Sequence, residues 1–340
     1  MSEVKRVLIL GGSWFLGRAI AAAAVAAGAH VTVFRRGVTG TDAAGVTPVT
    51  GDRADPDDLA RLVRSGPWDA VIDTSSYLPA ETLCLARALE PVVAHYVLVS
   101  TVAVYAGWPH EPLTEASPVL ACPSDANRPL AYGEAKAGCE RAVTRTFGPD
   151  RTTILRPGVI LGPLEYVGRL AWWLRRMRRG GRVLAPGPPT RTIQPVDVRD
   201  VAAFALHTAA TPGTWNLTSP GHDTMHDLLT SCNQVAAAGT AHLEWITDES
   251  WLQSHQISDW KQLPLWRPAR GTWAVDSHSA RTAGFHTRPL TATITDTWHW
   301  LTTGGAPITH PRATELGIPP SQEEAVLRAW DAHRSRPIRS

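Results

Sequence analysis

The sequence predicts a doubly wound α/β fold, in which helices cover both faces of a mostly parallel sheet. Short apolar runs alternate with helical stretches, a glycine-rich turn follows the first run, and this turn leads directly into an alanine-rich helix. The 340 residues are enough to bury one large core or two moderate ones. The 44% hydrophobic and 19% charged residues and the formal net charge of +2 are typical of a globular protein and indicate no polyanion-binding surface.

The first half of the chain supplies the strands of this sheet. Continuous apolar runs are typical of parallel strands that are covered on both faces. The predicted strands are residues 7–10, 31–34, 47–50, 70–73, 96–99 and 153–155. Helices are expected at 18–27, from Asp55 onward and at 132–147. Asp55 is a good helix cap and Pro56 suits the first helical position. This order fits a series of right-handed βαβ units.

The character of the chain changes after Pro157. Loops become longer, and nine of the fourteen Trp residues lie from Trp215 onward, where most are expected to pack in a core. Helical patterns remain at 168–179, 198–210, 224–238, 290–301 and 323–333. We therefore predict a sheet domain of residues 1–165 with part of 190–220, a smaller C-terminal substrate-binding lobe of residues 166–305, and a C-terminal tail of residues 306–340.

The cysteines and the N-terminus bear on the compartment. The four cysteines show neither a CxxC pair nor the spacing of metal ligands, so we expect no disulfide framework and no metal site. The N-terminus lacks a secretory cleavage site, and the apolar stretch at 19–27 is too short to span a bilayer. These features predict a cytoplasmic protein that binds no membrane, and the nearly balanced charge predicts no nucleic-acid partner.

The turn after the first strand is a candidate dinucleotide site. Glycines are needed where the backbone turns tightly and lets a pyrophosphate approach the amides at a helix N-terminus. A tight turn without a ligand is the plain alternative, but a position between the first strand and the first helix favours phosphate binding. The candidate residues in this turn are Gly11, Ser13, Trp14, Phe15, Leu16 and Gly17.

The ends of the next strands carry further candidates for cofactor binding. Arg35 and Arg36 follow the second strand, where arginines suit the 2′-phosphate of NADP(H) and a carboxylate would suit NAD(H). We therefore expect NADP(H) in preference to NAD(H), although two solvated arginines on a loop would give the same pattern. Asp52 lies where an acid can accept a hydrogen bond from the adenine amino group, and Asp73 begins a polar run; either acid could instead cap a turn. The other candidates at these strand ends are Arg53, Thr74, Ser75 and Ser100.

A tyrosine and a lysine form the candidate catalytic pair. Tyr132 and Lys136 stand four positions apart on a predicted helix and therefore share a face. A free phenol has a pKa of about 10, whereas a neighbouring ammonium favours the phenolate, and a shift of about three units requires roughly 4 kcal/mol. Tyr–Lys pairs on helices are common by chance. Here, however, the pair follows a strand that ends in Ser100 and Thr101, whose hydroxyls we expect at the same sheet edge.

Together these motifs resemble the extended short-chain dehydrogenase/reductases, in the NAD-dependent epimerase/dehydratase branch with its Rossmann sheet domain. The resemblance spans roughly residues 4–300 and rests on the glycine turn and on the segments STVAVY (100–105), YGEAK (132–136), LRPGVILGP (155–163) and VDVRDVA (196–202). It implies that Thr101 hydrogen-bonds the reacting oxygen, that Tyr132 is the acid/base, and that Lys136 holds the nicotinamide ribose and lowers the tyrosine pKa.

The resemblance also implies a loop beside the nicotinamide and a possible homodimer. At two places the sequence differs from the usual pattern of the family. The loop residues are Pro157, Gly158 and Val159. Trp14 replaces the middle glycine of the usual turn, as in a subgroup with GGTxFxG-like turns, so its side chain must point away from the pyrophosphate or the cofactor must shift. Val102 and Ala103 stand where sugar-nucleotide dehydratases of the family have acids, which disfavours a 4,6-dehydratase.

Several functions fit this pattern. We favour an NADPH-dependent ketoreductase that acts on a bulky small molecule, with a nucleotide-sugar epimerase as the alternative. A non-enzymatic relative, either RNA-associated or a dinucleotide sensor, is a further option that the intact Thr101, Tyr132 and Lys136 disfavour. An arginine-rich stretch within 169–179 could bind a substrate diphosphate or form a solvated face. The candidate substrate residues are Tyr77, Trp172 and Arg191.

Overall fold

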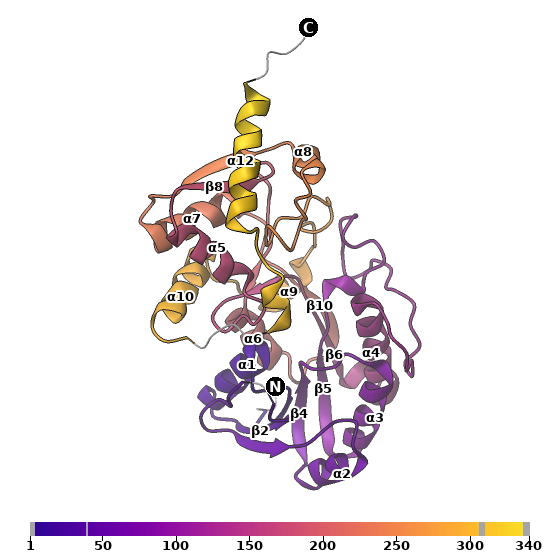
Figure 1. Cartoon of the computed structure of the whole chain (residues 1–340). Helices are drawn as coiled ribbons and strands as arrows, with labels where there is room; N and C mark the ends of the chain where they lie inside the picture. The colour runs from indigo at the N-terminus through magenta and orange to yellow at the C-terminus, as the bar shows by residue number, and fades with distance from the viewer. Residues whose placement is uncertain (1–3, 39, 306–309, 336–340) are drawn as a thin grey trace. The chain divides into compact units, whose positions relative to one another are not determined.

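A computed structural model describes residues 4–38, 40–305 and 310–335 of the chain. By their contacts, the described residues form two compact units (Figure 1). The first lies within Met1–Ile160, Pro195–Pro220 and Ala274–Thr287, and the second within Leu161–Gln194, Gly221–Trp273 and Arg288–Ser340. Among the helices of the described residues, none combines the length and the apolar character that crossing a bilayer requires.

The first unit is built on one parallel sheet of seven strands. The strand order is β10-β6-β5-β4-β1-β2-β3, and every neighbouring pair runs parallel. The strands are β1 (Arg6–Leu10), β2 (His30–Arg35), β3 (Thr47–Thr50), β4 (Trp68–Asp73), β5 (Val93–Val99), β6 (Thr152–Pro157) and β10 (Gly213–Leu217). The order reverses direction at β1, as in a doubly wound sheet. The predicted fold class is therefore confirmed.

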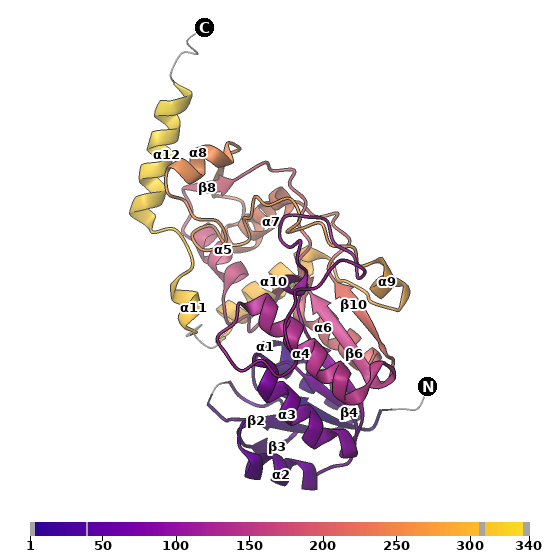
Figure 2. The same cartoon turned by 90° about the vertical axis from the view of Figure 1, so that its right-hand side faces the viewer.

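Helices cover both faces of this sheet (Figures 1 and 2). On one face α3 (Pro79–Leu89) packs along α4 (Tyr132–Phe147), and on the other α1 (Phe15–Ala26) packs along α6 (Val198–His207). The short helices α2 (Pro56–Arg64) and α9 (His278–Thr282) complete the unit. Apolar side chains of β1, β4 and β5 are buried almost completely, because both sheet faces are covered.

The second unit combines helices with a small sheet. Helices α5 (Arg169–Arg178), α7 (Met225–Ala237) and α10 (Leu290–Thr302) pack on one another, and β8 (Arg182–Pro186) pairs in parallel with β11 (His242–Ile246). Three more helices follow the chain, α8 (Glu249–Ser254), α11 (Pro311–Thr314) and α12 (Pro320–Arg334). Of the two remaining short strands, β7 (Ile160–Leu161) spans the boundary between the units in sequence, and β9 (Val196–Asp197), just before α6, belongs to the first unit. Trp173 and Trp266 are fully buried, as expected for core residues.

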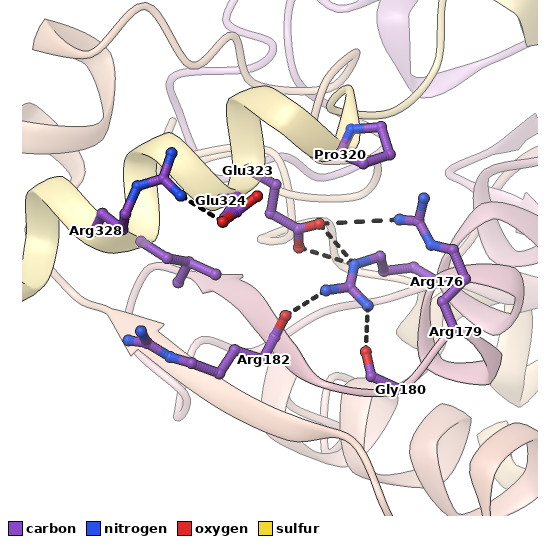
Figure 3. A pocket seen from close by; sticks show the side chains of 9 residues that line it. Arg176, Arg179, Gly180, Arg182, Pro320, Glu323, Glu324 and Arg328 are labelled. Atoms are coloured by element: carbon purple, nitrogen blue, oxygen red, sulfur yellow. Dashed lines mark hydrogen bonds and ion pairs between the residues drawn. The ribbon is translucent and has the colours of Figure 1, made fainter.

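The C-terminal helix is an integral part of the second unit, rather than a tail. Glu323 of α12 accepts hydrogen bonds from the Arg176 guanidinium at 2.8 and 2.9 Å (Figure 3). It also accepts a hydrogen bond from the Leu184 N–H at 3.1 Å. The Arg176 and Glu323 side chains are only 6% and 5% exposed. They line a cavity of about 520 Å³, together with half-exposed arginines of α5, β8 and α12. The predicted tail of residues 306–340 thus differs from the structure over 310–335, because α12 has a buried acid to pair.

The predicted domain boundaries differ from the observed units in two other places. Residues 161–165 are predicted in the sheet domain but belong to the second unit. Residues 274–287 were expected in the lobe but cluster with the sheet unit. The reason is local: Val275 forms a parallel bridge with Leu113, and the Asn216 side chain of β10 donates to the Asp276 carbonyl at 3.0 Å. A segment far along the chain therefore returns to cover the end of the sheet beside β10.

Candidate active site at the carboxyl edge of the sheet

Most of the predicted site residues of the first unit lie at one edge of its sheet. Gly11 follows β1, Thr74 and Ser75 follow β4, Thr101 follows β5 and Gly158 follows β6. These strands are consecutive neighbours and run parallel, so their carboxyl ends meet at the same edge. The topology therefore brings together residues that are up to about 150 positions apart in sequence.

The glycine turn after β1 is packed too tightly for other residues. Gly11 has a φ of +84°, and a Cβ on Gly17 would lie 2.1 Å from the Gly11 carbonyl oxygen. A Cβ on Gly11 would lie 2.8 Å from the Ser75 Cβ, so this turn also contacts the segment after β4. The first turn of α1 contains no acidic side chain. A helix N-terminus at a glycine turn without nearby acids suits the phosphates of a dinucleotide.

Trp14 occupies the N-cap of α1 with an extended backbone and a half-buried side chain. The loop after β2 passes close to it, because a Cβ on Gly40 would lie 2.1 Å from the Ser13 carbonyl oxygen and 3.4 Å from the Trp14 Cβ. Gly40 has a φ of +70°, so both its backbone conformation and its surroundings favour glycine. The departure from the usual turn at Trp14 is thus accompanied by a glycine in the neighbouring loop, which the sequence analysis did not single out.

The two arginines at the end of β2, Arg35 within the strand and Arg36 just after it, have different surroundings. Arg35 forms a two-contact ion pair with Asp42, in which its Nε lies 2.6 Å from the carboxylate. Hydrogen bonding to Arg35 lowers the pKa of Asp42. Arg36 is exposed, and within the described residues it has no hydrogen-bonding or ionic partner. Arg36 is therefore the better placed of the two for an anionic ligand, and Asp42 is a residue that the sequence analysis missed.

The two residues after β3 also differ. Asp52 is exposed, and its carboxylate accepts the Ala54 N–H at 2.9 Å, which is the turn-capping alternative considered for it. Arg53 instead points inward and pairs with Asp73, with Nη2 to Oδ1 at 3.2 Å and Nη1 to Oδ2 at 3.4 Å. It also contacts the Ser75 hydroxyl. Arg53 is thus committed to a buried cluster at the strand ends.

Asp73 is the centre of this cluster and is fully buried. The Tyr96 hydroxyl donates to it at 2.8 Å, the Ser75 N–H donates at 2.9 Å, and the Ser76 hydroxyl also donates to it. Burial alone would raise the pKa of Asp73, but Arg53 and these hydrogen bonds outweigh it and lower the pKa to about 2. Asp73 therefore stays ionised at neutral pH. Thr74, one position on, donates to the Leu10 carbonyl at 3.0 Å.

Lys136 of α4 is buried, with only 3% of its surface exposed. Its ammonium donates to the Val99 carbonyl at 2.6 Å and to the Ser76 carbonyl at 2.9 Å, and it lies 5.7 Å from the centre of the Tyr77 ring. An ammonium has three N–H donors, and no third acceptor is recorded among the described residues. Burial lowers the pKa of Lys136. The site thus holds a buried cation with one donor left for a ligand or a phenol.

The start of α4 closely approaches the short segment that follows Thr101. Thr101 is buried and caps the short 3₁₀ helix η2 (Val102–Val104), accepting the Ala103 N–H at 3.2 Å. A Cβ on Gly133 would lie 2.0 Å from the Ala103 carbonyl oxygen, so the start of α4 touches η2 directly. Tyr132 is the first residue of α4 and is 54% exposed. The glycine of YGEAK therefore allows α4 to begin directly against η2, the short helix that Thr101 caps.

Ser100 belongs to a second buried cluster that the sequence analysis missed. Its hydroxyl donates to Glu140, which is paired with Arg156 at 2.6 and 2.9 Å. Arg156 also donates to the Tyr105 hydroxyl at 2.9 Å, and that hydroxyl donates to Asn216 at 2.7 Å. Ser100 therefore fixes the β5 end to α4 in this structure. One signal was available: Glu140 lies one helical turn after Lys136 and so shares its inward face.

The remaining predicted residues fall in different places. In the first unit, the Gly158 N–H donates to the Leu217 carbonyl at 3.0 Å, which fixes the loop after β6, and Tyr77 is 56% exposed. In the second unit, Arg191 is paired with Glu249 at 2.8 Å and donates to the Arg267 carbonyl at 3.0 Å. Trp172 lies edge-on to its neighbour Trp173, with ring centres 4.7 Å apart. The turn, loop and strand-end candidates thus share one unit, whereas Arg191 and Trp172 belong to the other.

Comparisons with known proteins bear on the family and the fold of the chain. The sequence model of the NAD dependent epimerase/dehydratase family matches residues 7–217, which is more than half of the chain. A chloroplast stem-loop binding protein of 41 kDa (form b) from Arabidopsis thaliana is 26% identical over 220 residues, which cover 61% of this chain and 55% of that protein. The 2'-dehydrokanamycin reductase of Streptomyces kanamyceticus is 33% identical over 162 residues, which cover 46% of this chain and 44% of that protein.

The match with these curated relatives spans about half of their length. Among solved structures, the Bordetella bronchiseptica enzyme WbmG in complex with NAD and UDP has a similar fold. Its TM-score is 0.67 at 17% identity, with 89% of this chain and 96% of that chain covered. The resemblance to the extended short-chain dehydrogenase/reductases is confirmed. The chain belongs to the NAD-dependent epimerase/dehydratase family, whose members are NAD(P)-binding oxidoreductases.

Proposed function

We propose that the chain is an NADP(H)-dependent reductase that converts a ketone of a bulky small molecule to an alcohol. The observation that carries this proposal is that α4 holds the Lys136 ammonium against the Val99 carbonyl at the end of β5 and touches η2, just after Thr101, at the sheet edge that also holds the glycine turn. An acid/base, a hydroxyl donor and a buried cation beside a dinucleotide turn are the parts that carbonyl reduction needs. The matching family and the reductase among the relatives support this choice.

The residues of this edge fit a dinucleotide. Gly11 and Gly17 allow the turn to close tightly, because a Cβ on either would collide with neighbouring residues, and the N-terminus of α1 offers a positive end for the pyrophosphate. Lys136 has a donor left for the nicotinamide ribose. The bound nicotinamide supplies the hydride to the carbonyl carbon.

The chain itself supplies the proton and holds the charge. The Tyr132 phenol donates its proton to the carbonyl oxygen as that oxygen becomes an alcohol, and the Thr101 hydroxyl donates a hydrogen bond to the same oxygen. The Lys136 ammonium stabilises the phenolate that remains on Tyr132. Because Tyr132 is 54% exposed, water can return the proton after each turnover.

NADP(H) is the proposed cofactor because of Arg36. This guanidinium is exposed and suits a 2′-phosphate, whereas Arg35 is already neutralised by Asp42. We expect Arg36→Ala to weaken NADPH binding about tenfold and NADH binding much less, since a charge-assisted phosphate contact is worth about 1.5–3 kcal/mol. Titration of tryptophan fluorescence with each cofactor measures this. Equal losses for both cofactors would show that Arg36 does not contact the 2′-phosphate, and Arg35→Ala is the matched comparison.

An epimerase is the second candidate, favoured by the family model and by the UDP bound in the WbmG structure. The two reactions differ in whether free cofactor is consumed. The test follows nicotinamide absorbance with NADPH and a flat dicarbonyl such as 9,10-phenanthrenequinone, with aminoglycoside ketones, and with UDP-sugars followed separately by sugar analysis. Stoichiometric oxidation of NADPH that is lost in Tyr132→Phe supports the reductase. Sugar interconversion without net oxidation would overturn it in favour of the epimerase, and tight RNA binding without either activity would favour a non-enzymatic role.

A further inference from the structure

The buried cluster around Asp73 has no assigned part in the chemistry, although it adjoins the candidate catalytic lysine. Its members come from three parts of the sheet: Arg53 follows β3, Asp73 ends β4, and Tyr96 lies in the middle of β5. All three are buried or nearly so, with the Arg53 side chain 13% exposed and the other two fully buried. Bringing a carboxylate and a guanidinium out of water costs several kcal/mol, so such a cluster is a poor way to gain stability alone.

Ser76 connects this cluster to Lys136. Its hydroxyl donates to the Asp73 carboxylate and accepts from Arg53 Nη1 at 3.3 Å, while its carbonyl accepts from the Lys136 ammonium at 2.9 Å. The other acceptor of that ammonium, the Val99 carbonyl, ends strand β5 and is held by the sheet. Ser76 lies outside any strand or helix, in the segment between β4 and α3. Its carbonyl therefore depends on its own side chain for a fixed position.

The charge balance of the cluster suits the positioning of Lys136. A carboxylate that paired with Lys136 directly would neutralise the ammonium and weaken its effect on a neighbouring phenol. Asp73 is instead compensated by Arg53, and the group of this cluster that accepts a hydrogen bond from Lys136 is the neutral Ser76 carbonyl. The lysine is held in place while its charge stays available.

We propose that Asp73 is a positioning residue for Lys136, acting with Arg53 and Tyr96 through the Ser76 carbonyl. In this arrangement, loosening of Ser76 lets the ammonium move away from the reacting groups while the rest of the sheet stays intact. The inference rests on the proposed function, because it assumes that Lys136 serves the chemistry of Tyr132. It adds Asp73, Arg53, Ser76 and Tyr96 to the residues on which turnover depends.

The first test measures Lys136 itself and needs no substrate. The chain has three lysines, Lys5, Lys136 and Lys261, and Lys5 and Lys261 are exposed, so they serve as internal references. Brief treatment with acetic anhydride, followed by peptide mass spectrometry, gives the acetylation rate of each lysine. We expect Ser76→Ala and Tyr96→Phe to raise the rate at Lys136 at least about threefold relative to Lys261, because each removes a hydroxyl that fixes the cluster.

A matched control removes a buried hydroxyl elsewhere in the same sheet. Thr153 of β6 is fully buried, and its hydroxyl bonds to the Thr208 and Thr211 carbonyls and to His95, none of which belongs to the cluster. Thr153→Val should lose comparable thermal stability and leave the labelling of Lys136 unchanged. Ser76→Thr, which keeps a hydroxyl at the same position, should return labelling toward the wild-type rate. If Thr153→Val raised the Lys136 rate as much as Ser76→Ala, the cluster would have only a structural role and the proposal would fail.

The second test measures turnover of 9,10-phenanthrenequinone with NADPH. Ser76→Ala and Tyr96→Phe should lower kcat about tenfold with little change in the dissociation constant of NADPH. In a Lys136→Met background the same changes should have no further effect, because residues that act through one another are not additive. Unchanged kcat in Ser76→Ala, with Tyr132→Phe inactive, would overturn the positioning role alone. Full activity of Tyr132→Phe would instead overturn the proposed function.

Discussion

Each unit of the chain buries an arginine–carboxylate pair, but the two pairs have different surroundings. Arg53 and Asp73 are 20 residues apart in sequence, and their pair lies among the strand ends that carry the candidate active site. Arg176 and Glu323 are 147 residues apart, and their pair attaches α12 to α5 and β8 (Figure 3). The same kind of ion pair therefore lies within the candidate site in one unit and attaches a helix in the other. Burial of an ion pair does not by itself indicate function; its neighbours do.

The largest expected effect comes from a substitution that should abolish turnover and leave stability unchanged. Tyr132→Phe should lower kcat by about 10²–10⁴, the usual contribution of a positioned acid/base, because the ring lacks the proton that the carbonyl oxygen needs. The unfolding midpoint should stay within about 2 °C of wild type, since the side chain is 54% exposed. NADPH oxidation and differential scanning fluorimetry measure the two effects. Wild-type turnover would remove Tyr132 from the mechanism.

The second test removes stability without removing chemistry. Glu323→Gln leaves the Arg176 guanidinium buried without a carboxylate, which should lower the free energy of unfolding of the second unit by about 3–5 kcal/mol. The adjacent Glu324 is the matched control: it is 69% exposed and pairs with Arg328 on the surface, so Glu324→Gln should cost less than about 0.5 kcal/mol. Urea unfolding followed by tryptophan fluorescence compares them. Equal effects of both variants would show that burial of the Arg176 pair contributes nothing particular.

The third test concerns a buried base in the first unit that has no carboxylate partner. Burial, with a smaller effect of Arg151, lowers the pKa of His95 to about 4. Between this pKa and the ordinary value near 6.5, the unfolded chain binds a proton that the folded chain does not, so stability falls as pH drops through this range. We expect a loss of about 1–2 kcal/mol between pH 7 and pH 5, after allowing for solvent screening.

His95→Gln should reduce this pH dependence, and the exposed His207 offers the control. Urea unfolding of wild type, His95→Gln and His207→Gln at pH 7 and pH 5 measures the difference. If His95→Gln kept the full slope, another group would be responsible. Asp73 would not explain a slope in this range, because a carboxylate with a pKa of about 2 loses its stabilising charge only as pH falls below about 4.

The smallest effect is expected at the partly exposed pair of the first unit. Asp42→Asn removes the carboxylate that neutralises Arg35, and both side chains are about one-fifth exposed. Arg35 should then contribute to binding of a 2′-phosphate, which raises the ratio of NADPH to NADH affinity about three- to fivefold, the size expected for a partly screened charge. Fluorescence titration with both cofactors measures the ratio. A ratio that fell would show that Asp42 helps NADPH binding rather than opposing it.

The sequence predicted the first unit better than the second because its signals are local. The run of residues 7–10, the turn at Gly11 and the pair Tyr132 and Lys136 each lie within a few positions, and the structure has β1, α1 and α4 at these places. The helix α1 begins at Phe15 rather than at 18, because the turn tightens directly after Trp14. Strand β10 and helix α3 were not predicted, since each lacks a long run with a clear period.

The buried pairs could not be predicted because their partners are distant in sequence. Nothing near Arg176 indicates that Glu323 covers it, and the arginine-rich stretch at 169–179 is equally typical of a solvated face or a binding site. Asp73 was recognised as a polar residue at the sheet edge, but its partners come from three strands that only the folded sheet brings together. Sequence patterns therefore predict where strands end, but they do not predict which side chains at those ends bond to one another.

The contact between Gly133 and the Ala103 carbonyl has a consequence for how this site can vary. Even one added methyl group at position 133 would have to push the start of α4 away from η2, since a Cβ there would lie 2.0 Å from the carbonyl oxygen. The phenol would retreat with the helix, and a misplacement of about 1 Å can cost roughly a hundredfold in rate. Gly133 thus fixes the distance between α4 and η2. The position of the Tyr132 phenol is therefore set by a neighbouring residue that has no functional group.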